Sequence, residues 1–347
     1  MGRRRRDTGP GASLHGILLV DKPLGPTSHD VVGWARRVLR CRRVGHCGTL
    51  DPAASGLLVL AVGVATRTVP LLSAADKTYR ADIILGRRTT TADREGEVID
   101  EVRVEPSVAP QAMVAARGLV GAHSLPPPAY SAVKVDGVRA YARARRGEAV
   151  ELEPRPMRVF SVDNLETAVD APGTLRVSLD LRVSKGTYIR SLAELLGERL
   201  GLPAYLGGLR RLACAELQSE DPRTLRPQAR AEAEGRPDGK PWWRLDLAVG
   251  SAPAAASLIP IDEALGLPIV ECAADDALLA RLTQGQAVPA AAIGAGDRRP
   301  DELVSLVARA PDGALETLIV AAIRAGDGGP VVRPERVLRP DKVPRSA

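Results

Sequence analysis

The chain has 347 residues, of which 45% are hydrophobic, 26% are charged and 3% are aromatic, and its formal net charge is +6. These values place it among ordinary globular proteins with room for one large domain and a smaller one. No apolar run approaches the roughly 18 residues of a membrane span, which argues against a helical membrane protein. The basic charge is compatible with a polyanionic partner without establishing one.

The first predicted elements lie between residues 1 and 62. Residues 1–13 include four consecutive arginines and are expected to form a disordered basic arm. The apolar run 17–20 predicts a short buried strand that ends in a turn. Ser28 or Asp30 can cap a helix whose apolar face holds Val31, Val32, Ala35, Val38 and Leu39. A polar, glycine-punctuated loop, 42–56, then runs into a second buried strand, 57–62.

The middle of the chain mixes strands with separate helices. We expect a strand from Tyr79 to Leu85, a helix over 108–119 and a tight hairpin turn at Asp136-Gly137. Strict alternation over 175–183 predicts a half-buried strand, and helical spacing from Ile189 to Leu200 predicts a helix that Gly201 ends. Strands in runs with separate helices, rather than regular βα alternation, favour an α+β fold.

The composition changes after residue 218. Residues 219–257 are rich in Pro, Arg, Ala and Glu around Trp242-Trp243, and we interpret them as a linker or insertion. From 258 to 340, short apolar pieces separated by Gly, Pro and Asp predict a small β-rich domain. The expected organisation is therefore an arm (1–13), a main domain (14–218), a linker or insertion (219–257) and a small domain (258–340).

The loop 42–56 concentrates residues with special backbone or chemical properties. Its glycines permit backbone conformations closed to other residues, and Pro52 fixes the turn after Asp51. Asp51 is therefore a candidate nucleophile or base. The alternative is an ordinary turn stabilised by its own capping hydrogen bonds, which the local residues alone favour.

Two further segments hold candidate residues. Arg190 falls in the first turn of a predicted helix, where the helix dipole opposes a cation unless an acidic partner is near; the alternative is a solvent-exposed arginine. Tyr79 begins a strand between Lys77 and Arg80, and an aromatic face there could stack on an extruded base. Its alternative is a core tyrosine with a satisfied hydroxyl.

Cofactor and metal motifs find little support. The four cysteines are too few and too irregular for a disulfide framework. Cys41 and Cys47 lie near His29 and His46, but no C-x-x-C or H-x-x-x-H spacing accompanies them, so we expect no metal site. There is no P-loop and no G-x-G-x-x-G after a strand. Free thiols and the lack of a signal-peptide apolar region predict a cytoplasmic protein.

Six segments in this order resemble the TruB family of pseudouridine synthases: 16–28, 45–56, 77–80, 126–134, 184–190 and 209–212. The resemblance covers residues 14 to about 215 and weakens beyond, where 282–288 only hint at a PUA-like β-barrel. It implies an α+β pseudouridine-synthase fold, with a central mixed, largely antiparallel sheet flanked by helices and a small C-terminal RNA-binding β-rich domain.

The resemblance also implies an activity. A member of this family converts uridine 55 in the T-loop of tRNA to pseudouridine after extruding the base. The glycosidic C–N bond breaks, the uracil rotates, and C5 bonds to C1′ of the ribose. No cofactor and no metal are then needed. The expected partner is the T-arm of tRNA, and we expect a monomer with no membrane attachment, no obligatory protein partner and no guide RNA.

The same resemblance assigns roles to individual residues. Asp51 would attack C1′ or remove the C2′ proton, and the sequence does not choose between these routes. Arg190 would pair with Asp51 and keep it ionised. Tyr79 would stack on the flipped uracil and could accept the proton from C5. The other expected site residues are His46 in the space opened by the flipped base, Tyr188 and Leu209 lining the pocket, and Lys22 and Pro23 shaping the floor of the pocket.

Two competing functions remain in view. A non-catalytic tRNA-binding or tRNA-folding protein would use the same basic surface and aromatic residues. Such a protein has no need for Asp51, Tyr79 and Arg190 together. A carboxylate-dependent nucleoside or glycoside hydrolase would require a second acidic group as general acid, and no such group stands out near the motifs.

Overall fold

The computed structural model describes residues 14–340, apart from 129, 131–133, 136–137, 141–142, 144–145, 147–151, 236–240, 248–250, 273–276 and 327. The expected basic arm and the turn residues Asp136 and Gly137 lie outside the described residues. Within the described ranges, no helix is long and apolar enough to cross a membrane.

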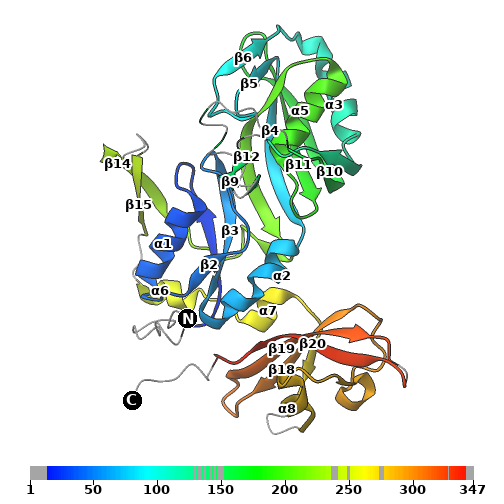
Figure 1. The fold of residues 1–347 in the computed structure, drawn as a ribbon. Coiled ribbons are helices and arrows are strands. Elements are labelled where there is room, and N and C mark those ends of the chain that lie inside the picture. The colour runs from blue at the N-terminus through cyan, green and yellow to red at the C-terminus, as the bar shows by residue number, and fades with distance from the viewer. Residues whose placement is uncertain are drawn as a thin grey trace.

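A nine-stranded sheet forms the centre of the main domain (Figure 1). Its strand order is β1-β3-β12-β4-β11-β10-β7, with β2 paired to β3 and β13 paired to β12. Only the β3–β12 pairing is parallel among these pairs, so the expected mixed, largely antiparallel sheet is confirmed. The strands are β1 (Gly16–Lys22), β2 (Val44–His46), β3 (Ala54–Val62), β4 (Lys77–Leu85), β7 (Gly121–Leu125), β10 (Arg155–Val169), β11 (Leu175–Val183), β12 (Ala204–Cys214) and β13 (Leu217–Gln218).

Strands β1 and β3 are buried on both faces of this sheet. In β1, Leu18 and Val20 belong to one apolar cluster, whereas Ile17 and Leu19 belong to another on the opposite face. Successive side chains of a strand point to opposite faces, and a strand covered on both sides reads as a continuous apolar run. This is why the sequence shows uninterrupted Ile, Leu and Val here instead of alternation.

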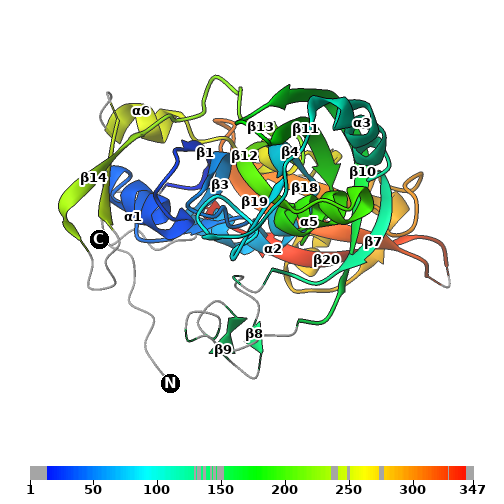
Figure 2. The ribbon, with the colours of Figure 1, turned by 90° about the horizontal axis from the view of Figure 1, so that it is seen from above.

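Helices cover both sides of the sheet. The first cluster takes residues from α1 (Ser28–Val38), α3 (Ala109–Arg117) and α5 (Ile189–Leu200). The second takes residues from η1 (Gly63–Thr68), α2 (Val69–Ala74) and α7 (Ile261–Leu265). Two small hairpins and a short helix complete this part: β5 (Arg87–Thr89) with β6 (Val98–Glu101), β8 (Lys134–Val135) with β9 (Val138–Arg139), and η2 (Pro106–Val108). Figure 2 shows β8 and β9 standing away from the sheet.

The C-terminal part is the small β-rich unit that the sequence predicted. Five strands pair in the order β16-β18-β19-β20-β17 around a separate apolar cluster. Its outer face joins the second cluster of the main domain through Val307, Leu318 and Leu338. The elements are β16 (Ile269–Glu271), α8 (Ala277–Thr283), β17 (Val288–Pro289), η3 (Ala290–Ile293), β18 (Leu303–Arg309), β19 (Leu315–Arg324) and β20 (Val331–Leu338).

The segment 219–257, expected to be a linker or insertion, is folded over most of its described length. It contains an antiparallel strand pair, β14 (Gln228–Gly235) with β15 (Pro241–Asp246), and the helix α6 (Ser251–Ala256). Leu225, Leu245 and Ala254 are buried in the main apolar cluster. The described part of this segment therefore has regular secondary structure and contributes to the main core. The run Ala229 to Glu234 alternates alanine with charged residues, a strand period that its linker-like composition hides.

Some element boundaries differ from the sequence expectation. Thr27, rather than Ser28 or Asp30, caps α1, and Asp30 completes a capping box with it. The Ser28 hydroxyl is instead bonded to the backbone of Leu50. The expected loop 42–56 contains strand β2, and β3 begins at Ala54, three residues before the apolar run. Both the presence of β2 and the early start of β3 reflect pairing to a neighbouring strand. β2 pairs with β3, and Ala54 pairs with Leu209 of β12, so regular structure extends into polar sequence.

Candidate active site

The loop between β2 and β3 presents Asp51 from a fixed backbone. The hydroxyl of Ser28 accepts from the Leu50 N–H at 2.8 Å and donates to the Leu50 carbonyl at 2.9 Å. The Gly25 N–H donates to the Pro52 carbonyl at 2.9 Å. The residues on either side of Asp51 are thus held, while its own side chain remains 52% exposed. Such an arrangement leaves a carboxylate available to a ligand without a mobile loop.

The guanidinium of Arg190, at the start of α5, is buried beside this carboxylate. Its side chain is 7% exposed, and Nη2 donates to Oδ2 of Asp51 at 3.0 Å. Nη2 also donates to the Tyr130 carbonyl at 3.0 Å, and Nη1 donates to the Thr91 carbonyl at 3.1 Å. The predicted pairing of Arg190 with Asp51 is present. It supplies the acidic partner that a cation in the first turn of a helix requires.

A second acid, Asp93, completes this arrangement and was missed from the sequence. Its side chain is 9% exposed, and Oδ2 lies 3.3 Å from Nη1 of Arg190. Oδ1 accepts from the Thr91 hydroxyl at 2.5 Å and from the Glu95 N–H at 3.0 Å. Arg190 therefore bridges a buried carboxylate and an exposed one. The only sequence signal is the Thr-x-Asp turn at 91–93, which is common in loops without any role in a site.

The pairing of strands in the sheet determines where Tyr79 and Leu209 lie relative to the strand that follows Asp51. Leu209 of β12 lies opposite Ala54 on one neighbouring strand and Ala81 on the other. Tyr79 belongs to the same apolar cluster as Leu50 and Ala54 and is 9% exposed. Strand β12 thus lies between β3, which follows Asp51, and β4, which carries Tyr79. The core and site interpretations of Tyr79 are both compatible with this position.

His46 and Tyr188 each lie a few residues before one member of the Asp51–Arg190 pair in the chain. His46 ends β2 and is partly buried, and its Nδ1 has no hydrogen-bond partner among the described residues. Burial, followed by the positive charges of Arg211 and His29, lowers the pKa of His46, so the neutral ring is favoured. Tyr188 is partly buried and is the N-cap residue of α5, two positions before Arg190.

Lys22 ends β1 opposite Gly56 of β3, and Pro23 follows it in the chain. The Lys22 side chain is fully buried, and its Nζ donates to the carbonyls of Pro23 and Pro26 at 2.9 and 2.8 Å. Burial lowers the pKa of Lys22 to about 8, and the negative charge of Asp51 partly opposes that shift. The ammonium group therefore fixes the backbone turn after β1 and adds positive potential near Asp51.

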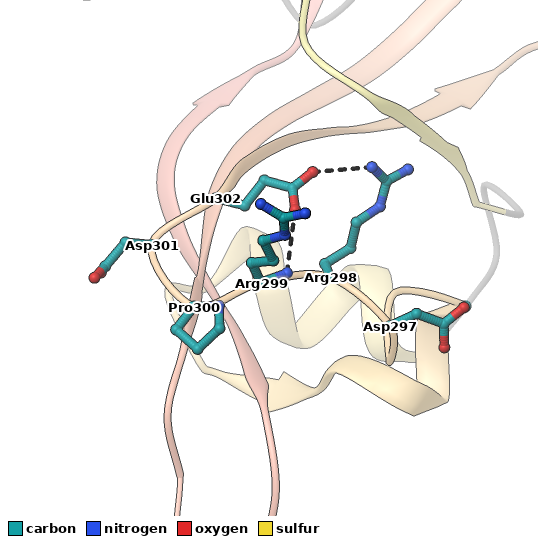
Figure 3. A pocket seen from close by; sticks show the side chains of 7 residues that line it. Asp297, Arg298, Arg299, Pro300, Asp301 and Glu302 are labelled. Carbon is teal, nitrogen blue, oxygen red and sulfur yellow. Dashed lines mark hydrogen bonds and ion pairs between the residues drawn. The ribbon is translucent and has the colours of Figure 1, made fainter.

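Other parts of the molecule offer weaker candidates. Among the described residues, no group of three or more His, Cys, Asp or Glu side chains is placed to hold a metal ion. A hollow in the C-terminal domain is lined by residues 294 and 297–302 (Figure 3). There the Arg298 guanidinium contacts Glu302 at 2.9 Å, and the Arg299 N–H donates to the same carboxylate at 3.1 Å. Arg298 and Glu302 pair with each other, and Asp301 pairs with Arg324 of β19, so Asp51 remains the stronger centre.

Known proteins resemble this chain in sequence and in fold. Residues 36–189 match the family described as TruB family pseudouridylate synthase (N terminal domain). A protein named tRNA pseudouridine synthase B from Cupriavidus taiwanensis is 38% identical over 95% of this chain and 96% of its own length. One of the same name from Opitutus terrae is 44% identical over 62% of this chain and 88% of its own. The structure of a Cbf5-Nop10-Gar1 complex contains a chain that is 25% identical, with a TM-score of 0.61 and coverage of 96% of this chain and 88% of that one.

Proposed function

Because the chain belongs to the TruB family of pseudouridylate synthases, we propose that it isomerises uridine to pseudouridine in tRNA with Asp51 as the reacting carboxylate. The target in this proposal is uridine 55 of the T-loop. The observation that carries it is the half-exposed Asp51 carboxylate held 3.0 Å from the buried Arg190 guanidinium. A charge-assisted hydrogen bond of this kind is short and directional, so it orients the carboxylate that the reaction uses.

The reaction rearranges bonds within one nucleotide. The extruded base enters beside Asp51, which either attacks C1′ or removes the C2′ proton. The N1–C1′ bond breaks, the uracil turns, and C5 bonds to C1′ as the carboxylate leaves C1′ or the proton returns to C2′. N1 takes up a proton in place of the one that C5 loses. The C5 proton must then leave, and Tyr79, stacked on the ring, is our candidate acceptor. Atoms and electrons balance without an oxidant or reductant, so the proposed reaction uses no cofactor.

The surface beside the site suits a nucleic-acid backbone. Arg36, Arg37, Arg40, Arg42 and Arg43 are all exposed at the end of α1 and in the turn that follows it. This turn leads directly into β2, which ends at His46. Clustered arginines bind the phosphates of a nucleic acid whatever its base sequence. We propose that these residues contact the T-arm while His46, Tyr188 and Leu209 border the extruded base.

The proposal extends to organisation and partners. Residues 14–218 would form the catalytic domain, with 258–340 as a separate RNA-binding domain. The enzyme would act as a cytoplasmic monomer on tRNA alone, without a guide RNA. The Cbf5 chain of similar fold occurs in a complex with Nop10 and Gar1. Activity that appears only after partner proteins are added would contradict the proposal that this chain acts alone.

A tritium-release assay tests the proposed function directly. The full chain, mixed with an unmodified tRNA transcript carrying 5-³H-uridine and with EDTA, is expected to release tritium, because forming the C5–C1′ bond expels the C5 hydrogen. No ATP, guide RNA or second protein is added. A transcript with cytidine at position 55 is the matched control and should release none above background. Binding without release would favour the tRNA-binding alternative.

Asp93→Asn is expected to slow turnover by about tenfold while leaving tRNA binding unchanged. The amide keeps one acceptor oxygen but can turn an N–H₂ toward Nη1 of Arg190, which loosens the guanidinium and, through it, Asp51; even small misplacements reduce rates strongly. Single-turnover tritium release and a tRNA binding titration measure the two quantities.

The control for Asp93 is Asp100→Asn. Asp100 lies on β6 and contacts Arg88 at 3.6 Å with a side chain that is 45% exposed. It loses the same charge at a surface position, so its turnover should match that of the wild type. A wild-type rate in Asp93→Asn as well would show that Asp51, Thr91 and Tyr130 suffice to hold Arg190.

A further inference from the structure

The two adjacent tryptophans of β15 have different environments. Trp242 is 48% exposed, whereas Trp243 is partly buried and lies opposite Ala231 of β14. A methyl group built on Gly25 would lie 2.3 Å from Cζ2 and 2.4 Å from Cη2 of Trp243. The indole ring therefore rests directly on the Gly25 backbone. Gly25 also has a φ of +102°, which other residues rarely adopt.

The segment that Trp243 covers is bonded to both sides of Asp51. Gly25 donates its N–H to the Pro52 carbonyl at 2.9 Å. Three residues later, the Ser28 hydroxyl bonds both backbone groups of Leu50, at 2.8 and 2.9 Å. A shift of the 25–28 backbone would thus be transmitted to the residues before and after Asp51.

The support behind Trp243 is itself anchored. Leu245, two residues further along β15 and on the same face, is 5% exposed within the main apolar cluster. The chain leading to β14 is fixed to β1 by hydrogen bonds from the Asp21 N–H to the Leu225 carbonyl, at 2.8 Å, and from the Leu225 N–H to the Leu19 carbonyl, at 3.0 Å. β15 lies beside α1 (Figure 1). The indole ring therefore acts as a fixed wall against the Gly25 turn.

From these contacts we infer that Trp243 is a positioning residue for Asp51, acting through Gly25 and Pro52. This inference rests on the proposed function, since it concerns the rate of the same reaction. Trp243 lies in the 219–257 segment, outside the six motif segments and outside the matched range 36–189. Residues that lock the backbone behind a reacting group hold it in productive geometry, and a misplacement of about 1 Å can cost about 10²-fold in rate.

Trp243→Ala and Trp242→Ala form a matched pair in the full chain. Trp243→Ala is expected to lower the single-turnover rate at saturating enzyme by about 10- to 100-fold with an unchanged tRNA dissociation constant. Trp242→Ala removes the same side chain from the exposed face and should keep the wild-type rate. Trp243→Phe retains an aromatic wall and should recover most of the rate. A general loss of stability would not be restored selectively in this way.

A double-mutant cycle keeps the inference testable if Trp243→Ala unfolds in a thermal melt. Gly25→Ala should slow the reaction because its methyl group meets the indole and because a φ of +102° is strained for alanine. Trp243→Phe should relieve the first part of that loss, giving non-additive rates. Additive effects would overturn the inference. So would a wild-type rate in folded Trp243→Ala, a loss expressed as weaker tRNA binding, or an equal loss in Trp242→Ala. A wild-type chain that forms no pseudouridine would instead refute the proposed function.

Discussion

Asp51→Asn is expected to reduce pseudouridine formation by at least about 10³-fold, because the reaction requires an ionised carboxylate and an amide is neither nucleophilic nor basic. The fold should tolerate the change. The Asp51 side chain is 52% exposed, and Arg190 keeps Asp93 and two backbone carbonyls as partners. Binding of tRNA should therefore persist. Tritium release and a gel-shift titration on the same preparation separate the two effects.

The control for this variant is Asp76→Asn. Asp76 forms a surface ion pair with Arg182 at 3.1 Å and has a side chain that is 36% exposed. Surface ion pairs contribute little to stability, so this variant should match the wild type in rate and melting temperature. Full activity in Asp51→Asn would remove Asp51 from the chemistry and return the loop to a structural role.

Arg190→Lys should reduce turnover by about 10²-fold with a much smaller effect on tRNA binding. Two guanidinium nitrogens serve four partners: Asp51, Asp93, Thr91 and Tyr130. A lysine has one ammonium nitrogen and lacks the planar fork that spans such partners. Loss of these contacts should leave Asp51 less well oriented and destabilise the fold by about 1–3 kcal/mol.

Arg199→Lys is the matched control for Arg190. Arg199 lies in the last turn of the same helix and is exposed. Its replacement should change neither rate nor melting temperature. The comparison needs single-turnover rates, tRNA titrations and thermal melts for both variants. An unaffected rate in Arg190→Lys would mean that positive charge alone, without the fork, supports Asp51.

Local sequence patterns predicted those elements whose ends and buried faces both follow from nearby residues. The alternation over 175–183 became β11, and the helix from Ile189 to Leu200 ends at Gly201, whose φ is +65°. The charge argument at Arg190 left two outcomes, an acidic partner or a solvent-exposed side chain. The structure shows the first, with Asp51 and Asp93 as the partners.

The features that were missed depend on contacts between distant segments. Asp93 meets Arg190 across 97 positions of sequence, and nothing near residue 93 marks it as buried. The 219–257 segment has the composition of a linker. Its fold depends on the Gly25 turn for Trp243 and on the main core for Leu245. Roles for Asp51 and Tyr79 came from the order of six motifs, because each residue alone had an ordinary structural explanation.

The two faces of strand β1 are buried by elements that are synthesised at different times. Its first face, with Leu18 and Val20, belongs to the cluster that includes α1, the next helix along the chain. Its second face meets Ile259, whose backbone exchanges hydrogen bonds with Ile17 at 2.9 and 2.8 Å, and then the strands of the C-terminal domain. At a synthesis rate of roughly 5–20 residues per second, those partners leave the ribosome on the order of tens of seconds later. One of the first strands made is therefore fully enclosed only after the C-terminal domain has been made, although η1 and α2 pack in the cluster of its second face earlier.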